Sequence, residues 1–332
     1  MPRRIVVPPS LQHLAGRQES LVSIGQCREH GMTDQQVGTL VGTKRWRRVM
    51  LGVLDPGVPA TGLHDAFDRA RRRGAIVGSL AFPGSVVTGV PALVLHGVQG
   101  APRRVLPEVT FPNGAPRTSE KPVRVRRERL RRWMLVDRIP CVPVELALAQ
   151  AVPELDRGHA VALMDSARQR RLITEDGFRL ARDLARGRRG AARTAPWWDA
   201  SDPRAESPVE SDARLAFVDA GYPPDAVQLE ILDEHGRFLA RPDLAWFLPD
   251  GRVVPVELDG HEAHSTPEAL FGDRRRQNAL VARGARMLRF TGRDVAADAV
   301  VPEVSRLLDA EGWAPRPWPS GEPLILPTPR ST

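Results

Sequence analysis

Short hydrophobic stretches, separated by polar and turn residues, recur between residues 207 and 310. They predict a helix that begins at Ser207-Pro208, with Leu215 and Val218 at helical spacing. A second helix is expected from about residue 267 to 283, before a final helix. The strands are expected at residues 225–233, 237–247, 252–259 and 285–290. Such an order gives an α/β sandwich, in which the acidic ends of strands can converge on one open edge of the sheet.

Two short helices and a basic strand are expected near the amino terminus. Ser20 is a possible N-cap of a helix over residues 20–31, and Thr33 caps a second helix. The basic stretch of residues 44–57 follows as a strand that ends in a turn. Two helices joined by a glycine-containing turn and followed by a basic wing are typical of a winged helix-turn-helix. A generic helical cap is the alternative.

The middle of the chain contains a long uncharged segment. Residues 75–102 have no Asp, Glu, Lys or Arg, and the segment is long enough to span a bilayer. However, Pro83-Gly84 and Gly89 with Pro91 would break such a helix twice, and no second segment of this kind exists to support it. We therefore expect a buried strand-turn-helix core and no membrane association.

Composition shifts divide the chain into four parts. Residues 196–207 look like a boundary, and six prolines from Pro315 to Pro329 predict an extended or disordered tail. The expected parts are a winged helix-turn-helix DNA-binding domain (1–60), a basic α+β middle domain (61–195), an α/β domain (207–310) and a proline-rich tail (315–332).

Charge points to nucleic acid as a partner. Residues 121–195 hold 18 Lys and Arg against 9 Asp and Glu, a surplus of nine that accounts for the whole net charge of +8. Such a block can pair with phosphates, although an arginine-rich solvated surface explains it equally well. Trp46 is expected to anchor the basic wing in the core. The candidate contacts to double-stranded DNA are Lys44, Arg45, Arg47, Arg48, Arg274 and Arg275.

The cysteines and the amino terminus favour a reducing compartment. Cys27 and Cys141 are too far apart in sequence to form a metal-binding pair or a disulfide framework. The chain begins with two arginines and a short apolar run that prolines interrupt, which is not a secretory signal. A cytoplasmic location is the expectation.

Acidic residues at the ends of the predicted hairpin strands suggest chemistry. Hydrolysing a phosphodiester at neutral pH requires a divalent ion that polarises the phosphate and lowers the pKa of the attacking water. Mg²⁺, or Mn²⁺ in its place, is held by carboxylate and carbonyl oxygens. Asp243 and Glu257 could supply two such oxygens and the Leu258 carbonyl a third. Glu210, on the preceding helix, could hold a metal-bound water.

Four segments carry a resemblance to a known family. They resemble the DUF559-type endonuclease-like domain, a relative of the very-short-patch-repair endonucleases within the PD-(D/E)xK superfamily. The segments are "SPVES" with its following "ARL", "RPDLAW", "VELDGHEAH" and "DRRRQNAL" with its following "ARGARMLRFT". The first 195 residues resemble the amino-terminal half of AbiEi-type antitoxin-like proteins, on the residues "RWRRVMLGVL" and "ALVLHGV".

The resemblance implies roles for individual residues. Asp243 and Glu257 become the metal-binding acids, and Glu210 the acid of the helix. Asp259 begins a turn that brings His264 toward the scissile phosphate as general acid or base.

One position departs from the superfamily pattern. The usual lysine, two positions after the second acid, is Asp259 in this chain. Arg276, on the helix expected after the hairpin, could supply the missing cation. Two functions therefore remain open: a Mg²⁺-dependent DNA endonuclease, or a non-catalytic DNA-binding regulator or antitoxin-like protein with a degenerate nuclease fold, which could have a toxin-like protein as partner.

Overall fold

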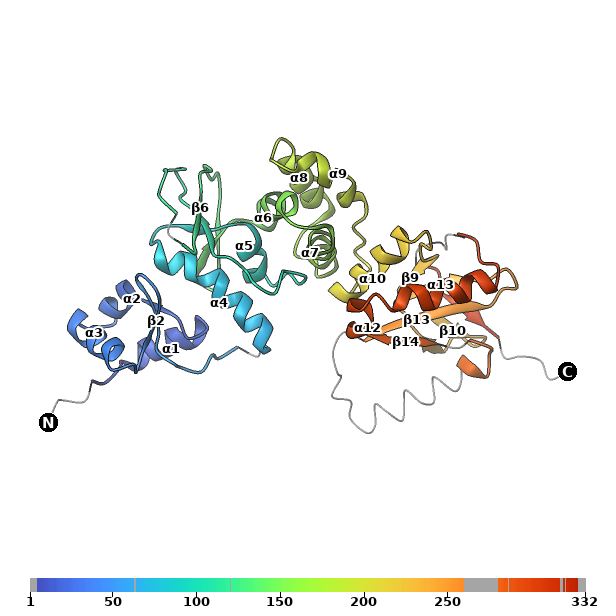
Figure 1. The fold of residues 1–332 in the computed structure, drawn as a ribbon, viewed down its shortest axis with the longest axis horizontal. Helices are drawn as coiled ribbons and strands as arrows, with labels where there is room; N and C mark the ends of the chain where they lie inside the picture. Colours follow the sequence, from blue (N-terminus) through green and yellow to red (C-terminus); the bar gives the residue numbers. More distant parts are fainter. Residues whose placement is uncertain are drawn as a thin grey trace. The chain divides into compact units, whose positions relative to one another are not determined.

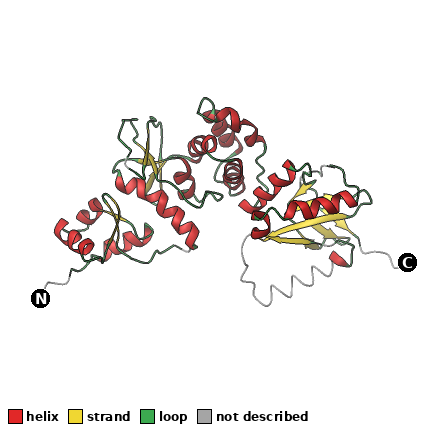
Figure 2. Cartoon of the chain, in the orientation of Figure 1, coloured by secondary structure: helices red, strands yellow, loops and turns green. Residues whose placement is uncertain are grey.

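The fold is mixed α/β, with helices and several sheets (Figures 1 and 2). The computed structural model describes residues 5–62, 64–119, 121–259, 280–285, 287–316, 319 and 321–327. Unit 1 contains Met1–Leu163 and Arg170–Pro196, and unit 2 contains Met164–Gln169 and Trp197–Thr332. Within the described part of the chain, no helix has both the length and the apolar character needed to cross a bilayer.

Unit 1 begins with three helices and a three-stranded antiparallel sheet of order β1-β3-β2. Capping boxes start two of the helices: Ser23 and Thr33 each accept a hydrogen bond from the backbone N–H three residues later. The prediction for Thr33 is confirmed, whereas the prediction for Ser20 is wrong. The elements are α1 (Pro9–Arg17), β1 (Val22–Ser23), α2 (Ile24–Glu29), α3 (Asp34–Gly42), β2 (Arg47–Met50) and β3 (Val53–Asp55).

Ser20 contacts the hairpin instead of capping a helix. Its backbone is left-handed, with φ of 62°, and its hydroxyl donates to Asp55 over 2.7 Å. The basic stretch after α3 is a hairpin rather than one strand, because Gly52, with φ of 76°, turns the chain between β2 and β3. Trp46 is 5% exposed and belongs to the hydrophobic core beneath this sheet, as expected of an anchor.

The remainder of unit 1 contains a five-stranded mixed sheet of order β6-β5-β4-β8-β7. The uncharged segment is largely buried as predicted, but its order is not strand-turn-helix: the last turns of α4 come first, and a turn at Pro83-Gly84 precedes β4 and α5. The strands are β4 (Val86–Val87), β5 (Glu108–Thr110), β6 (Arg124–Arg126), β7 (Met134–Val136) and β8 (Ile139–Cys141). The helices are α4 (Ala66–Ala81), α5 (Gly89–Leu95), α6 (Val144–Ala151), the 3-10 helix η1 (Val152–Glu154), α7 (Arg157–Gln169), α8 (Glu175–Ala185) and α9 (Ala191–Asp199), of which α7 and α9 also contribute residues to unit 2.

Unit 2 contains a four-stranded sheet of order β14-β13-β12-β9 and a three-stranded sheet of order β11-β10-β15. The first two predicted strands are each split in two, and their halves belong to different sheets. The strands are β9 (Ala226–Val227), β10 (Ile231–Asp233), β11 (Phe238–Ala240), β12 (Leu244–Phe247), β13 (Val253–Asp259), β14 (Leu288–Thr291) and β15 (Leu324–Leu326). The helices are α10 (Pro208–Asp219), α12 (Gly292–Ala296) and α13 (Val300–Ala310).

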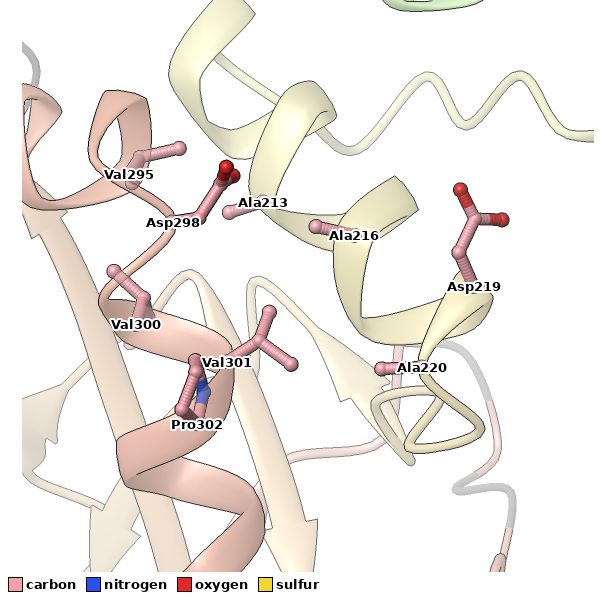
Figure 3. Close-up of a pocket in the computed structure, with 9 residues that line it drawn as sticks. All are labelled: Ala213, Ala216, Asp219, Ala220, Val295, Asp298, Val300, Val301 and Pro302. Carbon is pink, nitrogen blue, oxygen red and sulfur yellow. The ribbon is translucent and has the colours of Figure 1, made fainter.

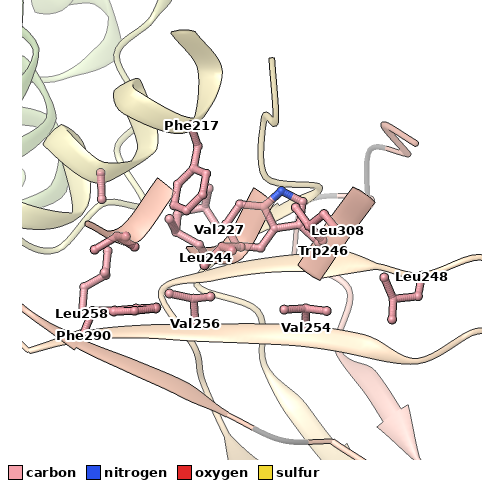
Figure 4. Packing of buried hydrophobic residues seen from close by; sticks show 13 residues of the cluster. Phe217, Val227, Leu244, Trp246, Leu248, Val254, Val256, Leu258, Phe290 and Leu308 are labelled. Atoms are coloured by element: carbon pink, nitrogen blue, oxygen red, sulfur yellow. The ribbon is translucent and has the colours of Figure 1, made fainter. Parts of the chain in front are cut away.

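The four-stranded sheet is buried on both faces. Successive side chains of a strand point to opposite faces, so Leu244 and Trp246 of β12 join one hydrophobic cluster while Ala245 and Phe247 join another. The first cluster includes α10 and α13, and Figure 4 shows Phe217 over Trp246, with ring centroids 4.7 Å apart. Because all four residues of β12 are buried, polar groups can reach this strand only at its ends.

The proline-rich tail contains a regular, paired strand, which the expectation of an extended or disordered tail did not include. Leu324–Leu326 forms β15, which pairs in parallel with β10, and the Leu324 N–H donates to the Glu230 carbonyl over 2.8 Å. Pro323 and Pro327 flank this strand, where their missing N–H groups do not interrupt the ladder.

A buried acid ties the last turn of α7 to α10 within unit 2. Asp165 is 1% exposed and accepts hydrogen bonds from Ser211 Oγ at 2.8 Å, Arg214 Nη2 at 3.0 Å and the Asp202 N–H at 2.7 Å. Ser211 and Arg214 lie on α10, directly after Glu210. Unit 2 therefore depends on a residue that precedes its main segment in the sequence.

Asp165→Asn should destabilise unit 2 strongly. The substitution keeps the size of the side chain but leaves the buried Arg214 guanidinium without its counter-charge. We expect the free energy of unfolding of unit 2 to fall by about 3–5 kcal/mol, as is typical when one partner of a buried ion pair is removed. Native-state hydrogen exchange of the β12 amides in the full chain measures this change.

Glu206→Ala is the matched control. The Glu206 carboxylate pairs with Arg241 over 2.8 Å, but the two side chains are 40% and 47% exposed. Because exposed ion pairs contribute little, we expect a loss of at most about 1 kcal/mol. Equal losses in the two variants would contradict the assignment of Asp165 as a structural anchor.

Candidate functional site

A row of polar residues crosses the four-stranded sheet at one end of its strands. Leu244 of β12 pairs with Val256 of β13 and with Val227 of β9. One step earlier along the chain, Asp243 therefore lies beside residue 257 on one side and residue 228 on the other. Glu257 in turn pairs with Arg289 of β14. The row is Gln228, Asp243, Glu257 and Arg289.

Asp243 is held by donors from both neighbouring strands. Its Oδ2 accepts a hydrogen bond from the Leu258 N–H at 2.7 Å, and its Oδ1 accepts one from Gln228 Nε2 at 2.7 Å. The Asp243 carbonyl also accepts from the Gln228 N–H at 2.9 Å. These contacts fix the carboxylate directly before the start of β12.

Glu210 enters the site from the first turn of α10. Ser207 caps this helix by accepting a hydrogen bond from the Glu210 N–H at 3.3 Å, as the sequence predicted. The Glu210 side chain is 5% exposed, and its Oε2 accepts from the Glu206 N–H at 2.8 Å and from Gln228 Nε2 at 3.0 Å. One amide nitrogen of Gln228 thus bridges the carboxylates of Glu210 and Asp243.

Gln228 reaches both carboxylates from a strained backbone. Its φ of 54° is in the left-handed region, which costs a non-glycine residue on the order of 1 kcal/mol. Sequence reasoning missed this residue, because nothing in its neighbourhood indicates a left-handed conformation. Strain of this kind at a cluster of acids is typical of functional sites.

The electrostatics of the cluster oppose ionisation of Asp243. Burial raises its pKa first, the negative charge of Glu210 raises it further, and Glu257 adds to this. The hydrogen bonds from Leu258 and Gln228 lower the pKa but do not compensate, and the result is a pKa of about 7. Asp243 therefore changes its charge near neutral pH.

Arg289 is a second residue that sequence reasoning missed. Its Nε lies 2.7 Å from Glu257 Oε2, and both side chains are about one-third exposed, at 37% and 34%. The parallel register between β13 and β14 brings them together. Since that register depends on tertiary packing, no local pattern in the sequence indicates that this arginine lies beside the acids.

The other predicted site residues have different outcomes. Asp259 is exposed at the end of β13, two residues beyond Glu257, and Leu258 contributes its N–H to Asp243. His264, Arg276, Arg274 and Arg275 lie outside the described residues. Among the residues that the structure describes, no three His, Cys, Asp or Glu side chains form a ready metal-binding group. The roles of the acids as metal ligands therefore remain predictions.

The basic residues after α3 are exposed but not equivalent. Lys44, Arg45 and Arg48 are exposed. Arg47 is also exposed, yet its Nη2 lies 3.1 Å from Asp55 Oδ2, and the Asp55 side chain is only 13% exposed. Burial alone would raise the pKa of Asp55, but the hydrogen bonds from Ser20, Gly57 and Arg47 hold it below its usual value. Arg47 therefore has a structural partner within its own sheet.

A separate pocket of about 450 Å³ lies between α10 and the segment of α12 and α13 (Figure 3). Its charged lining residues are Asp219 and Asp298, and the others are apolar: Ala213, Ala216, Ala220, Val295, Val300, Val301 and Pro302. The pocket is separate from the acidic cluster, because none of Glu210, Asp243 and Glu257 lines it.

Comparison with known proteins gives relatives but no family. No family model matches the chain. Two uncharacterized proteins of Mycobacterium tuberculosis, MT2308 and Rv2248, are each 34% identical to it over 123 residues, which is 37% of this chain and 44% of each relative. The chain therefore spans less than half of the length of these relatives. The activity, substrate and partners of the whole protein are matters for proposal.

The raised pKa of Asp243 predicts a pH dependence of stability. Its pKa rises from 3.8 in the unfolded chain to about 7 in the folded one, so the native state resists ionisation. The contribution of Asp243 is fully present below about pH 4 and is lost as the pH rises to 7. From pH 5 to pH 8 this amounts to about 2–3 kcal/mol of unfolding free energy. Urea denaturation in EDTA should show this decrease in the wild type and a smaller one in Asp243→Asn.

The comparison between the two proteins cancels the titration of every other group. If the wild type and the Asp243→Asn variant lost the same free energy between pH 5 and pH 8, Asp243 would not be the group that titrates.

Proposed function

We propose that unit 2 is a metal-dependent endonuclease-like domain that hydrolyses phosphodiesters of double-stranded DNA. The observation that carries this proposal is the convergence of Glu210, Asp243 and Glu257, where burial and then the negative charges of the two glutamates raise the pKa of Asp243 to about 7. A fold gains nothing in stability from such an arrangement. A divalent cation would relieve the repulsion.

The donor set suits a hard cation such as Mg²⁺ or Mn²⁺. Asp243 and Glu257 lie on adjacent strands and would hold the ion together with the Leu258 carbonyl, while Glu210 would hold a water on it. When bound, the ion would polarise the phosphate and lower the pKa of the attacking water. Glu257 would have to exchange its contact with Arg289 for the ion.

Arg289 is the candidate for the cation that the superfamily lysine supplies elsewhere. It extends from β14 to Glu257, so it could contact a phosphate beside the metal ligands. Arginine binds phosphate oxygens through two parallel N–H groups, which suits this task. The resemblance of the chain to the DUF559-type and very-short-patch-repair-like domains supports the same assignment of the acids.

The amino-terminal region is proposed to bind the DNA. Two helices with capping boxes, followed by a basic hairpin that pairs with the short strand before them, are the parts of a winged helix-turn-helix. Lys44, Arg45 and Arg48 are exposed around this hairpin and could pair with phosphates.

The second candidate is a non-catalytic DNA-binding regulator or antitoxin-like protein. Two observations favour it. Asp259 stands where the superfamily has a lysine, and Arg289 already forms an ion pair with the carboxylate of Glu257. In that case unit 2 would keep a DNA-binding surface without turnover, and a toxin-like protein could be its partner.

Metal binding separates the two candidates. If the acids share an ion, millimolar Mg²⁺ or Mn²⁺ should raise the melting temperature of unit 2, because the ion binds only the native state. At a hundredfold excess over Kd the stabilisation is about 2.7 kcal/mol. Asp243→Asn should abolish both this shift and the nicking of a supercoiled plasmid. Differential scanning calorimetry and a plasmid-nicking assay measure the two effects.

Two further variants sharpen this test. Glu303→Gln, on the exposed side of α13, should keep both the metal shift and the nicking. Arg289→Ala frees Glu257, so it should strengthen metal binding and lower the nicking rate. DNA binding in EDTA by a wild type that shows no metal shift and no nicking would instead establish the regulator.

Reversing charge on the hairpin should weaken DNA binding. In Arg45→Glu/Arg48→Glu, two exposed cations become anions without loss of the Arg47 contact to Asp55. We expect affinity for a duplex of about 30 base pairs to fall at least tenfold at low salt, and the dependence of affinity on salt to become flatter. A gel-shift titration in EDTA at several salt concentrations measures both.

The matched control reverses two exposed arginines, one on α8 and one at its C-cap. Arg179→Glu/Arg186→Glu changes the net charge by the same amount at a different place. An equal loss of affinity in both double variants would indicate a general charge effect and would contradict the winged-helix assignment.

A further inference from the structure

Three consecutive large hydrophobic side chains of unit 1 are exposed to solvent. Trp133 is 48% exposed, Met134 48% and Leu135 66%. They follow two exposed arginines, Arg131 and Arg132, in the basic segment for which the sequence left phosphate pairing and a solvated surface equally open. Phosphate binding explains the arginines but not the hydrophobic side chains, since exposed apolar clusters usually mark a surface that another molecule covers.

Met134 and Leu135 lie on the outer strand of a sheet, and Trp133 directly precedes it. In the order β6-β5-β4-β8-β7, β7 has β8 on one side, and no strand of the described residues pairs with its other side. Asp137 and Arg138, with φ of 48° and 68°, form the two-residue turn between β7 and β8. The tight turn holds β7 in its edge position.

The backbone of Leu135 faces this open side. Leu135 pairs with Pro140, which has no N–H to donate, so this pair is the non-hydrogen-bonded kind. In an antiparallel ladder the residues of such pairs direct their N–H and C=O groups away from the partner strand. The edge therefore presents one backbone donor and one backbone acceptor, flanked by exposed hydrophobic side chains.

The charges around the edge define what can pair with it. Arg131, Arg132 and Arg138 contribute three positive charges, and the negative charge of Asp137, in the turn between β7 and β8, already pairs with Arg72 at 2.9 Å. Arg132 pairs with Glu145 at 3.4 Å, but its side chain is 67% exposed and remains accessible to a second carboxylate.

The same charges disfavour a second copy of this chain. An antiparallel pairing centred on Leu135 would place Arg132 of one copy opposite Arg138 of the other, twice in the same dimer. Like charges directly opposite each other destabilise a strand pair. The edge is suited to a partner strand that carries acidic residues.

We propose that β7 binds an extended, acidic segment of another protein by strand addition. The partner's backbone pairs with the N–H and C=O of Leu135, its apolar side chains cover Trp133 and Leu135, and its carboxylates pair with Arg131 and Arg132. This surface is independent of the acidic cluster and of the DNA-binding hairpin.

The test uses a synthetic peptide array and the full chain. The probes are fluorescein-labelled nine-residue peptides with two Glu at each end and Val, Ile, Phe or Thr in the five central positions, beside versions with Lys in place of Glu. Fluorescence polarisation should show binding of acidic peptides and none of their lysine counterparts. Leu135→Pro removes the outward N–H but no bond to β8, so it should keep the melting temperature and weaken peptide binding about tenfold or more.

A charge-swap variant keeps the test independent of the proline. Arg131→Glu/Arg132→Glu should lose the acidic peptides and gain the lysine peptides, whereas Leu106→Ser, which changes an exposed leucine outside β7, should bind as the wild type does. The proposal is overturned if no acidic peptide binds, if neither variant changes binding, or if the β7 variants lose affinity for DNA instead. A wild-type dimer that Leu135→Pro disperses in sedimentation would identify a second copy as the occupant and would also overturn it.

Discussion

The antiparallel register of β12 and β13 is the constraint on which the rest of unit 2 depends. It pairs Leu244 with Val256 and Trp246 with Val254, and these side chains form the core against α10 and α13. The same register places Asp243 beside Glu257 at the strand end. A slip of one residue would turn both sets of side chains to the wrong faces. Core packing and the proximity of the carboxylates are therefore a single property of the sheet, and the hydrophobic residues hold the acids together.

Helix α10 contacts one buried acid that supports the fold and contains another that is a candidate for function. Near the start of α10, Ser211 and Arg214 contact the buried Asp165 of α7. Asp165 also accepts a hydrogen bond from a backbone N–H, so its charge is compensated. One residue before Ser211, Glu210 faces another carboxylate across the amide of Gln228. Burial raises the pKa of both Asp165 and Asp243, but the Arg214 charge opposes the shift at Asp165, whereas the Glu210 charge adds to it at Asp243, beside the strained backbone of Gln228. Groups placed where they oppose stability are candidates for function.

The features that local chemistry determines could be predicted from the sequence. Ser207 and Thr33 cap helices as expected, and Ser23, not Ser20, could have been chosen because Gln26 completes its capping box. The resemblance located the three acids, although their roles remain predictions, as do those of His264 and Arg276. Gln228, Arg289 and the strand at Leu324–Leu326 could not be found, because a left-handed φ, a parallel register and the pairing of a three-residue strand depend on tertiary structure.

The pairing of β10 with β15 has a consequence for how the chain folds. It joins Ile231 to Leu324, which are far apart in the sequence. The chain between them must close into a long loop, and it loses that conformational entropy before the contacts between β10 and β15 stabilise it. The β2–β3 hairpin, by contrast, joins neighbours through Gly52 and can form at once. We therefore expect the β10 sheet to be completed late. Until β15 pairs with it, β10 keeps an open edge, and an open strand edge can pair with another chain.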